Sequence, residues 1–235
     1  MLRLIPKLRS AMHLAIYDLD RTITKRGTFT PFLIFAARRR APWRLAGLPL
    51  WIVAMACHKL GLVARKPLKQ FGLRLLLGRT ISTQAADTLA ADYARHTLAY
   101  NVQPGALASI EADRAEGRML IMATAAPDLY AAAVGTALGF AATIATRHVR
   151  LPHGGISSQI EGENCYGTYK LAMIEAWLLA TGTTPATTRF YSDHLSDAPV
   201  LGWADQGFLV NAGLPLHKMA ESHGWTMVSF EGAPK

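Results

Sequence analysis

The sequence predicts an α/β fold: a mainly parallel sheet flanked by helices, with one inserted segment that is all helical. Three short apolar stretches, residues 15–17, 119–123 and 189–192, indicate strands. Each ends at a polar side chain that could do chemistry, namely Asp18, Thr124 or Asp193. In open α/β sheets, functional side chains gather just beyond the carboxyl ends of the strands. The same observations therefore predict both the sheet and the edge where a site should lie.

Periodicity and turn residues predict the other elements. In chain order they are a helix at 104–117, a helix at 127–138, a hairpin of 144–151 with 155–160, a helix at 170–179, and strands at 207–210 and 225–229. Pro127 suits the first turn of its helix, and Gly182 suits a helix end. In the helix at 104–117, Ile110 is expected to face inward, with Glu111, Asp113, Arg114 and Glu116 facing solvent. The alternation of strands and helices predicts the parallel sheet.

Asp18 and Asp20 form the most informative local pattern. They follow the first strand within Asp18-Leu19-Asp20-Arg21-Thr22. Carboxylates at i and i+2 share one side of an extended backbone, and they repel unless a divalent cation or a shared proton intervenes. One acid could then attack as a nucleophile while the other transfers protons. The alternative is a strand that ends in a solvated Asx turn.

Four further residues follow in a fixed order. Thr124 ends the second strand, Lys170 lies in the first turn of a predicted helix, and Asp193 and Asp197 follow the third strand. Each has an ordinary structural alternative: Thr124 or Asp197 could cap a helix, and Lys170 could be solvated. Taken together in this order, the residues resemble the motif set of the haloacid dehalogenase superfamily, in its phosphatase branch.

The resemblance covers nearly the whole chain. Residues 125–130, 164–167 and 209–211 look like subfamily IB. The resemblance implies a Rossmann-like catalytic core formed by residues 1–24 and 101–235, with a helical cap at 25–100.

The resemblance also implies a phosphomonoester hydrolase with an aspartyl-phosphate intermediate. Asp18 is the expected nucleophile, and Asp20 is the expected general acid and base. Thr124 is expected to donate a hydrogen bond to the phosphoryl oxygens. Lys170 is expected to supply a fixed positive charge beside the nucleophile and the phosphate.

A Mg²⁺ ion is the implied cofactor. Its expected ligands are Asp18, the backbone carbonyl of Asp20, and Asp193. Asp197 is expected to orient Lys170 or a metal-bound water. Many members of the family carry glycine where this chain has Arg21, which could reach the substrate or point to solvent.

The positive charge is concentrated in one segment. Residues 21–86 contain no Asp or Glu and hold 13 of the 25 lysines and arginines, so the rest of the chain has a net charge of −4. The positive electrostatic potential of this segment attracts anionic partners. Because the basic residues bracket aliphatic runs and no nucleic-acid-binding motif is present, we do not expect nucleic acid to be the partner.

The basic segment also contains an uncharged run of 13 residues, 45–57, with Pro49 in its first half. This run is shorter than the roughly 20 residues that span a bilayer. With Trp43 and Trp51 available at the headgroup level, it suits a helix lying in the interface of an anionic membrane. The alternative is a cap whose apolar side packs on the protein itself.

The expected location is the cytoplasm, with peripheral contact to the inner face of the membrane. Cys57 and Cys165 give no disulfide framework, which fits a reducing compartment. Residues 1–7 lack a long apolar core and do not resemble a signal peptide.

The choice of substrate rests on the cap. Phosphoserine phosphatases need a carboxylate for the substrate ammonium, whereas this chain has none between Asp20 and Asp87. Phosphatidylglycerophosphatases of the C type have a cap with a long aliphatic stretch between basic flanks, as this chain does. We therefore expect a phosphorylated lipid such as phosphatidylglycerophosphate. A soluble phosphatase of the phosphoserine type and an inactive membrane-associated regulator remain as alternatives.

Overall fold

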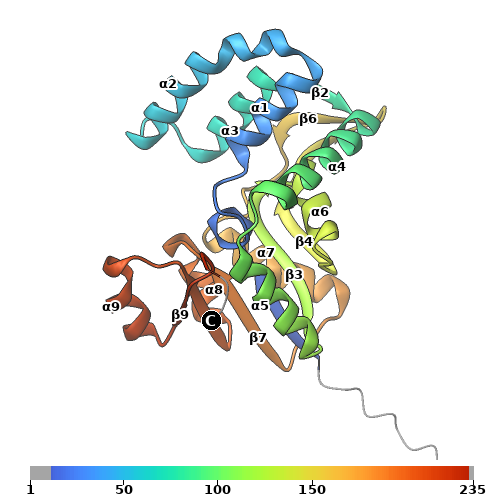
Figure 1. Ribbon diagram of the computed structural model, residues 1–235. Helices are drawn as coiled ribbons and strands as arrows, with labels where there is room; N and C mark the ends of the chain where they lie inside the picture. Colours follow the sequence, from blue (N-terminus) through green and yellow to red (C-terminus); the bar gives the residue numbers. More distant parts are fainter. Residues whose placement is uncertain (1–11, 233–235) are drawn as a thin grey trace, which may run out of the picture.

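The computed structural model describes residues 12–232, so the prediction about residues 1–7 lies outside the described part. Its centre is a six-stranded sheet of order β4-β3-β1-β7-β8-β9, in which every neighbouring pair is parallel (Figure 1). The strands are β1 (His13–Tyr17), β3 (Met119–Pro127), β4 (Ala142–Thr146), β7 (Thr187–Ser192), β8 (Gln206–Val210) and β9 (Thr226–Val228). The predicted fold class is confirmed.

Helices cover both faces of this sheet. They are α5 (Pro104–Ala115), α6 (Asp128–Ala137), α7 (Thr168–Thr181), α8 (Ala198–Trp203) and α9 (Leu214–His223). Alternate residues of β1 point to opposite faces: Ala15 and Tyr17 belong to the core under α5 and α6, whereas Leu14 and Ile16 belong to the core under α7 and α8. This burial on both faces explains why the strand sequences are continuously apolar.

The prediction for Gly182 agrees with the structure: Gly182 directly follows α7, and its φ of 63° places it in the left-handed region that glycine adopts without steric penalty. Pro127 is the last residue of β3 and directly precedes α6, so it does not lie in the first turn of that helix as predicted. The predicted strand at 144–151 is in fact divided. β4 joins the main sheet, and β5 (His148–Leu151) pairs with β6 (Gly155–Ile160) in a separate hairpin.

The prediction that Asp113 faces solvent is wrong. Its carboxylate is buried, because this side of α5 packs against the sheet. It accepts hydrogen bonds from the Tyr17 hydroxyl at 2.6 Å and from Arg189 Nη1 at 2.5 Å. A buried carboxylate is tolerated when it is hydrogen-bonded and paired in this way.

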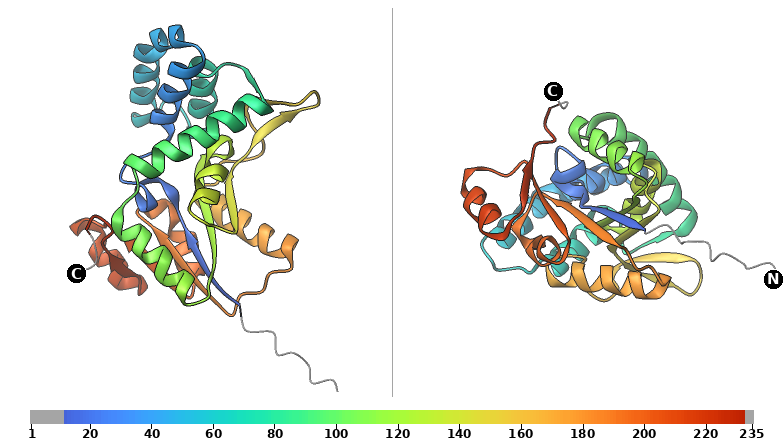
Figure 2. Two further views of the ribbon diagram at one scale, coloured as in Figure 1. Left: turned by 45° about the vertical axis from the view of Figure 1, so that its right-hand side comes forward. Right: turned by 90° about the horizontal axis from the view of Figure 1, so that it is seen from below.

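The segment between β1 and β3 is mostly helical. It contains α1 (Phe29–Arg40), a short helix Pro42–Gly47, α2 (Leu48–Lys59), α3 (Arg65–Leu76) and α4 (Thr83–Tyr100). It is not entirely helical, since β2 (Thr80–Ser82) pairs with β6 in a three-stranded antiparallel sheet of order β2-β6-β5. α4 lies along α6, while α1, α2 and α3 form a group beyond the end of the main sheet (Figures 1 and 2). The exact division at residues 24 and 100 stays a prediction.

Trp51 is buried, so it is not available at a membrane surface as the sequence suggested. Its ring lies against Gly72 of α3, where an added Cβ would come within 2.7 Å of the ring. Its indole nitrogen donates to Thr30 Oγ1 at 3.3 Å. Trp51 therefore holds α2 to α1 and α3. Within residues 12–232, none of the helices has the length and apolar character required to cross a bilayer.

Candidate active site

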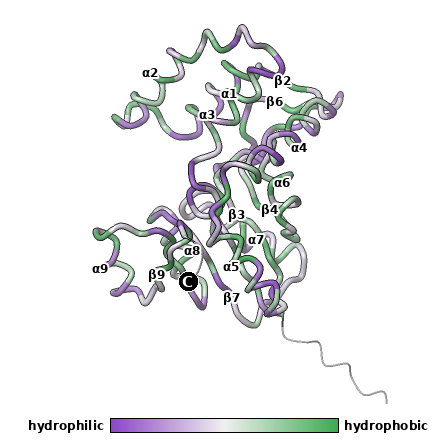
Figure 3. The backbone as a smooth tube through the Cα atoms, viewed as in Figure 1, coloured by the Kyte–Doolittle hydropathy of each residue, from purple (hydrophilic) through white to green (hydrophobic). Residues whose placement is uncertain are grey.

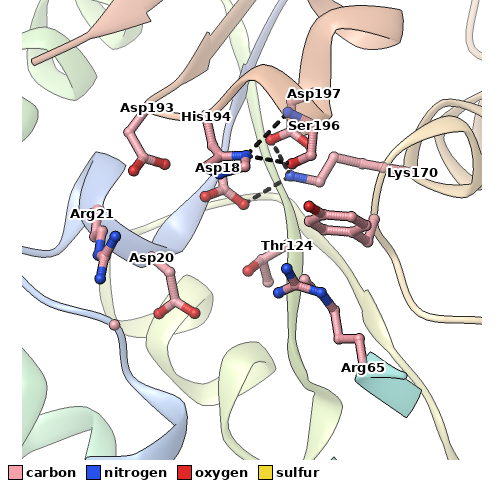
Figure 4. Close-up of a pocket in the computed structure, with 13 residues that line it drawn as sticks. Asp18, Asp20, Arg21, Arg65, Thr124, Lys170, Asp193, His194, Ser196 and Asp197 are labelled. Carbon is pink, nitrogen blue, oxygen red and sulfur yellow. Dashed lines mark hydrogen bonds and ion pairs between the residues drawn. The ribbon is translucent and has the colours of Figure 1, made fainter. Parts of the chain in front are cut away.

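A pocket of about 300 Å³ lies at the carboxyl ends of β1, β3 and β7, between the sheet and the helical segment. All seven predicted site residues line it (Figure 4): Asp18, Asp20, Arg21, Thr124, Lys170, Asp193 and Asp197. Because β3, β1 and β7 are adjacent and parallel, the polar side chains at their ends meet at one edge of the sheet. The structure therefore brings the predicted residues together.

Backbone hydrogen bonds fix the loops that carry the acids. The Asp18 N–H donates to the carbonyl of Tyr191 at 3.0 Å, which extends the pairing of β1 with β7 into the site. The Asp193 N–H donates to Thr22 Oγ1 at 2.9 Å. Thr22 of the first motif therefore positions the last one.

Lys170 bridges two acids in the buried part of the pocket. Its ammonium lies 2.9 Å from Asp18 Oδ1 and 2.5 Å from Asp197 Oδ2. Burial by itself lowers the pKa of Lys170, but Asp18 and Asp197 outweigh burial and hold it above its ordinary value. Lys170 is therefore a fixed positive charge.

Burial raises the pKa of Asp18 to about 7, and the ammonium of Lys170 opposes this shift. Burial also raises the pKa of Asp193. Both carboxylates would gain from a further positive charge, since a cation favours the ionised form.

Asp20 is oriented by residues that the sequence did not reveal. Its Oδ1 accepts from the Thr28 N–H at 2.7 Å and from the Thr28 hydroxyl at 2.6 Å. The Tyr130 hydroxyl lies 2.8 Å from Thr28 Oγ1, and Tyr93 donates to the Thr28 carbonyl at 2.7 Å. Burial raises the pKa of Tyr130 well above its ordinary value, so its hydroxyl keeps its proton and can donate. No local sequence signal links Thr28, Tyr93 and Tyr130.

Arg21 occupies a backbone conformation that favours glycine, with φ of 62° and ψ of −2°. Gln103 Nε2 stabilises the turn by donating to the carbonyls of Arg21 and Thr22, each at 2.9 Å. The Arg21 side chain is exposed and lines the pocket. Where many family members carry glycine, this chain therefore has a positive charge at the mouth of the site.

The helical segment contributes a second arginine that we did not predict as a site residue. Arg65, at the start of α3, lines the pocket, and its guanidinium carbon lies 4.0 Å from the centre of the Tyr166 ring. One turn later, buried Lys69 donates to the Ala125 carbonyl, next to Thr124, and to Asn164 Oδ1 at 2.9 Å. α3 is thus fastened to the loop that follows Thr124.

Thr124 is well placed to donate into the pocket. Its Oγ1 accepts from the Ala126 N–H at 3.1 Å, which leaves the hydroxyl proton free for another acceptor. This observation fits the predicted contact with phosphoryl oxygens.

The oxygen atoms of the site suit a hard cation such as Mg²⁺. Within residues 12–232, no three His, Cys, Asp or Glu side chains form a metal-binding group. The predicted ligand set needs only two carboxylates, Asp18 and Asp193, with the backbone carbonyl of Asp20. Asp197 Oδ1 is buried without a hydrogen-bond partner among the described residues, and it could accept from a metal-bound water. The residues present therefore fit the cation.

The comparisons with known proteins agree with this architecture. The model of the haloacid dehalogenase-like hydrolase family matches residues 15–202. The chain is 28% identical to Protein CicA of Caulobacter vibrioides over 204 residues. This match covers 86% of this chain and 88% of CicA.

Two solved structures share the fold. A protein of unknown function from Bordetella pertussis Tohama I is 23% identical, with a TM-score of 0.83 over 93% of this chain and 99% of that one. A phosphoserine phosphatase with a phospho-aspartyl intermediate analogue is 14% identical, with a TM-score of 0.59 over 94% of each chain.

Proposed function

Because this chain belongs to the haloacid dehalogenase-like hydrolases, we propose that it is a Mg²⁺-dependent phosphomonoesterase that works through an aspartyl-phosphate. The observation that carries this proposal is the contact of Lys170 with both Asp18 and Asp197 at the ends of β1 and β7. Phosphoryl transfer requires mainly positioning and charge neutralisation, which this arrangement supplies. Assignment to subfamily IB stays a prediction.

The first half of the proposed reaction uses Asp18 and Asp20. Lys170 engages Oδ1 of Asp18, so Oδ2 is available to attack phosphorus. A bond forms between this oxygen and phosphorus while the bond from phosphorus to the leaving oxygen breaks. Asp20, held by Thr28, gives its proton to the leaving oxygen.

In the second half, Asp20 takes a proton from water, whose oxygen attacks phosphorus. The bond to Asp18 breaks, and inorganic phosphate and the free carboxylate are released. Thr124 and Lys170 bind the phosphoryl oxygens in both halves. A Mg²⁺ ion held by Asp18, the Asp20 carbonyl and Asp193 would neutralise phosphoryl charge.

We further propose that the substrate carries a second anionic group beyond its phosphate monoester. Arg21 and Arg65 line the pocket, and among the described residues its only acidic side chains are the four of the predicted motifs. A substrate ammonium would meet like charge there, whereas a phosphodiester would be attracted. A phosphorylated anionic lipid such as phosphatidylglycerophosphate has this chemistry.

A small-molecule phosphatase of the phosphoserine type is the second candidate. The fold shared with phosphoserine phosphatases supports it. The two candidates differ in what the arginines of the pocket contact.

The test is phosphate release from phosphatidylglycerophosphate, its deacylated headgroup, phosphoserine and an aryl phosphate, with Mg²⁺ or with a chelator. We expect kcat/KM to fall in that order from lipid to headgroup to phosphoserine, and chelation to abolish turnover. Asp18→Asn should lower turnover of every substrate by several powers of ten, because an amide cannot act as the nucleophile. Turnover of Asp18→Asn close to that of the parent would contradict the mechanism. A preference for phosphoserine would instead select the second candidate.

A further inference from the structure

The outer side of α2 presents an apolar surface to solvent. Leu50, Ile52 and Val53 are 53–59% exposed, and Leu60 and Leu62 in the following turn are 75% and 73% exposed. We call these five residues the α2 face. Figure 3 shows α2 as a largely hydrophobic helix in the group with α1 and α3, beyond the end of the main sheet. Since Trp51 already fills the inward side of the helix, packing within the protein does not account for this face.

A strongly basic pocket lies at the amino-terminal end of α2. Its volume is about 610 Å³, and no Asp or Glu from the described part of the chain lines it. Four arginines contribute to it, namely Arg40, Arg44, Arg74 and Arg79. We call it the arginine pocket. Beside them, Trp43 is 72% exposed.

The four arginines are not neutralised by carboxylates. Arg44 has a structural role, because it donates to the carbonyls of Arg74 and Leu75 at the end of α3 and stacks on Trp43. Within residues 12–232, Arg40, Arg74 and Arg79 form no salt bridge. Their charges are therefore available to an anionic ligand.

α2 lies between residues of the two pockets along the chain. α2 starts directly after the short helix that carries Arg44, and the turn after α2 leads into Arg65 at the mouth of the candidate active site. Figures 1 and 2 show α2 on the outside of the group formed with α1 and α3. Consider a flat surface that has anionic groups at its boundary and an apolar interior. If it contacted α2 along its length, it would lie close to the segments that carry Arg44 and Arg65.

We propose that the α2 face lies in the interface of an anionic phospholipid bilayer and that the arginine pocket holds lipid phosphate groups. Apolar side chains enter the boundary between headgroups and acyl chains, and the arginines attract the anionic surface. A second copy of this chain fits less well, because residues 48–59 of its α2 contain no Asp or Glu that could neutralise the arginines. Membrane docking is a separate property from the proposed reaction and does not depend on it.

The test is co-sedimentation of the full chain with phosphatidylcholine vesicles that contain or lack phosphatidylglycerol. We expect binding only to the anionic vesicles and release at high salt, since salt screens the attraction. Arg40→Gln with Arg79→Gln should weaken binding by about fivefold for each arginine removed. Ile52→Ser with Val53→Ser should weaken it by more than tenfold, because two half-exposed aliphatic side chains no longer enter the interface.

Matched variants on the catalytic core provide the controls. Leu179→Ser on α7 and Lys218→Gln on α9 change exposed residues of similar character that belong to neither the α2 face nor the arginine pocket, and both should bind as the parent does. All variants should keep their melting temperatures and their turnover of a soluble aryl phosphate, so a failed reaction and a failed docking surface are distinguishable. Three results would overturn the proposal. They are absence of binding to anionic vesicles, equal losses in the controls, and a dimer in solution that Ile52→Ser with Val53→Ser dissociates.

Discussion

The ammonium of Lys170 lies 2.5 Å from Oδ2 of Asp197, while Oδ1 of the same carboxylate is buried without a partner among the described residues. Asp197 thus holds Lys170 against Asp18 through Oδ2, and its Oδ1 is available to accept a further hydrogen bond. Ser192, the last residue of β7, fixes the contact by donating to Oδ2 at 2.7 Å. Three charges at this depth stabilise the fold only as a set, because each would be unfavourable alone.

We expect Lys170→Met to lower the free energy of unfolding by about 3–5 kcal/mol in the absence of Mg²⁺, because Asp18 and Asp197 would be left as buried, unpaired carboxylates. Urea unfolding at neutral pH measures the loss. Lys218→Met, which removes an exposed lysine, is the matched control and should change little. Equal stability of the two variants would mean that the buried ion pairs contribute nothing.

Thr28→Val should impair the general acid selectively, since it removes the hydroxyl that orients Asp20. We expect turnover of an alkyl phosphate to fall by about tenfold more than turnover of an aryl phosphate, whose leaving group needs less protonation. Steady-state kcat for the two substrates measures this ratio. Tyr130→Phe, one hydrogen bond farther away, should shift the ratio in the same direction by less. Equal losses on both substrates would instead indicate a binding or folding defect.

Lys69 should make stability depend on pH. Burial, with nearby Arg65, lowers the pKa of Lys69 from 10.5 to about 7 in the folded protein. Between about pH 7 and pH 10 the unfolded chain therefore binds more protons at this site, and the free energy of unfolding rises with pH. Relative to Lys69→Met, the parent should gain stability over this range. Thermal unfolding of both proteins at several pH values measures the difference, and a constant difference would show that Lys69 keeps its ordinary pKa.

Arg65→Gln should raise KM for substrates with a second anionic group and leave KM for an aryl phosphate within about twofold, because the guanidinium is expected to contact the substrate beyond its phosphate monoester. Lys66→Gln is the matched control. It removes the neighbouring cation, which pairs with Glu163 instead of lining the pocket. An equal rise in KM for both classes of substrate would indicate that Arg65 maintains the shape of the pocket and does not contact the second anionic group.

The sequence by itself determined the parallel sheet and the seven residues at its edge. Asp18 and Asp193 each follow a buried strand, Thr124 lies near the carboxyl end of β3, and the carboxyl ends of adjacent parallel strands necessarily meet. Local patterns were sufficient here because each residue is fixed by its own strand. The signals at Pro127, directly before α6, and at Gly182, directly after α7, were equally local, because they depend on the backbone preferences of single residues.

The tertiary structure decided what depends on contacts between distant segments. In the uncharged run 45–57, no polar residue marks an outer side, so only packing shows that Trp51 points inward while Ile52 and Val53 face solvent. Asp113 looks like a surface residue until Tyr17 and Arg189 are brought to it. Thr28 and Tyr130 are 102 positions apart in the chain yet hydrogen-bonded beside Asp20. Such contacts leave no local periodicity, because they exist only after the helices have packed on the sheet.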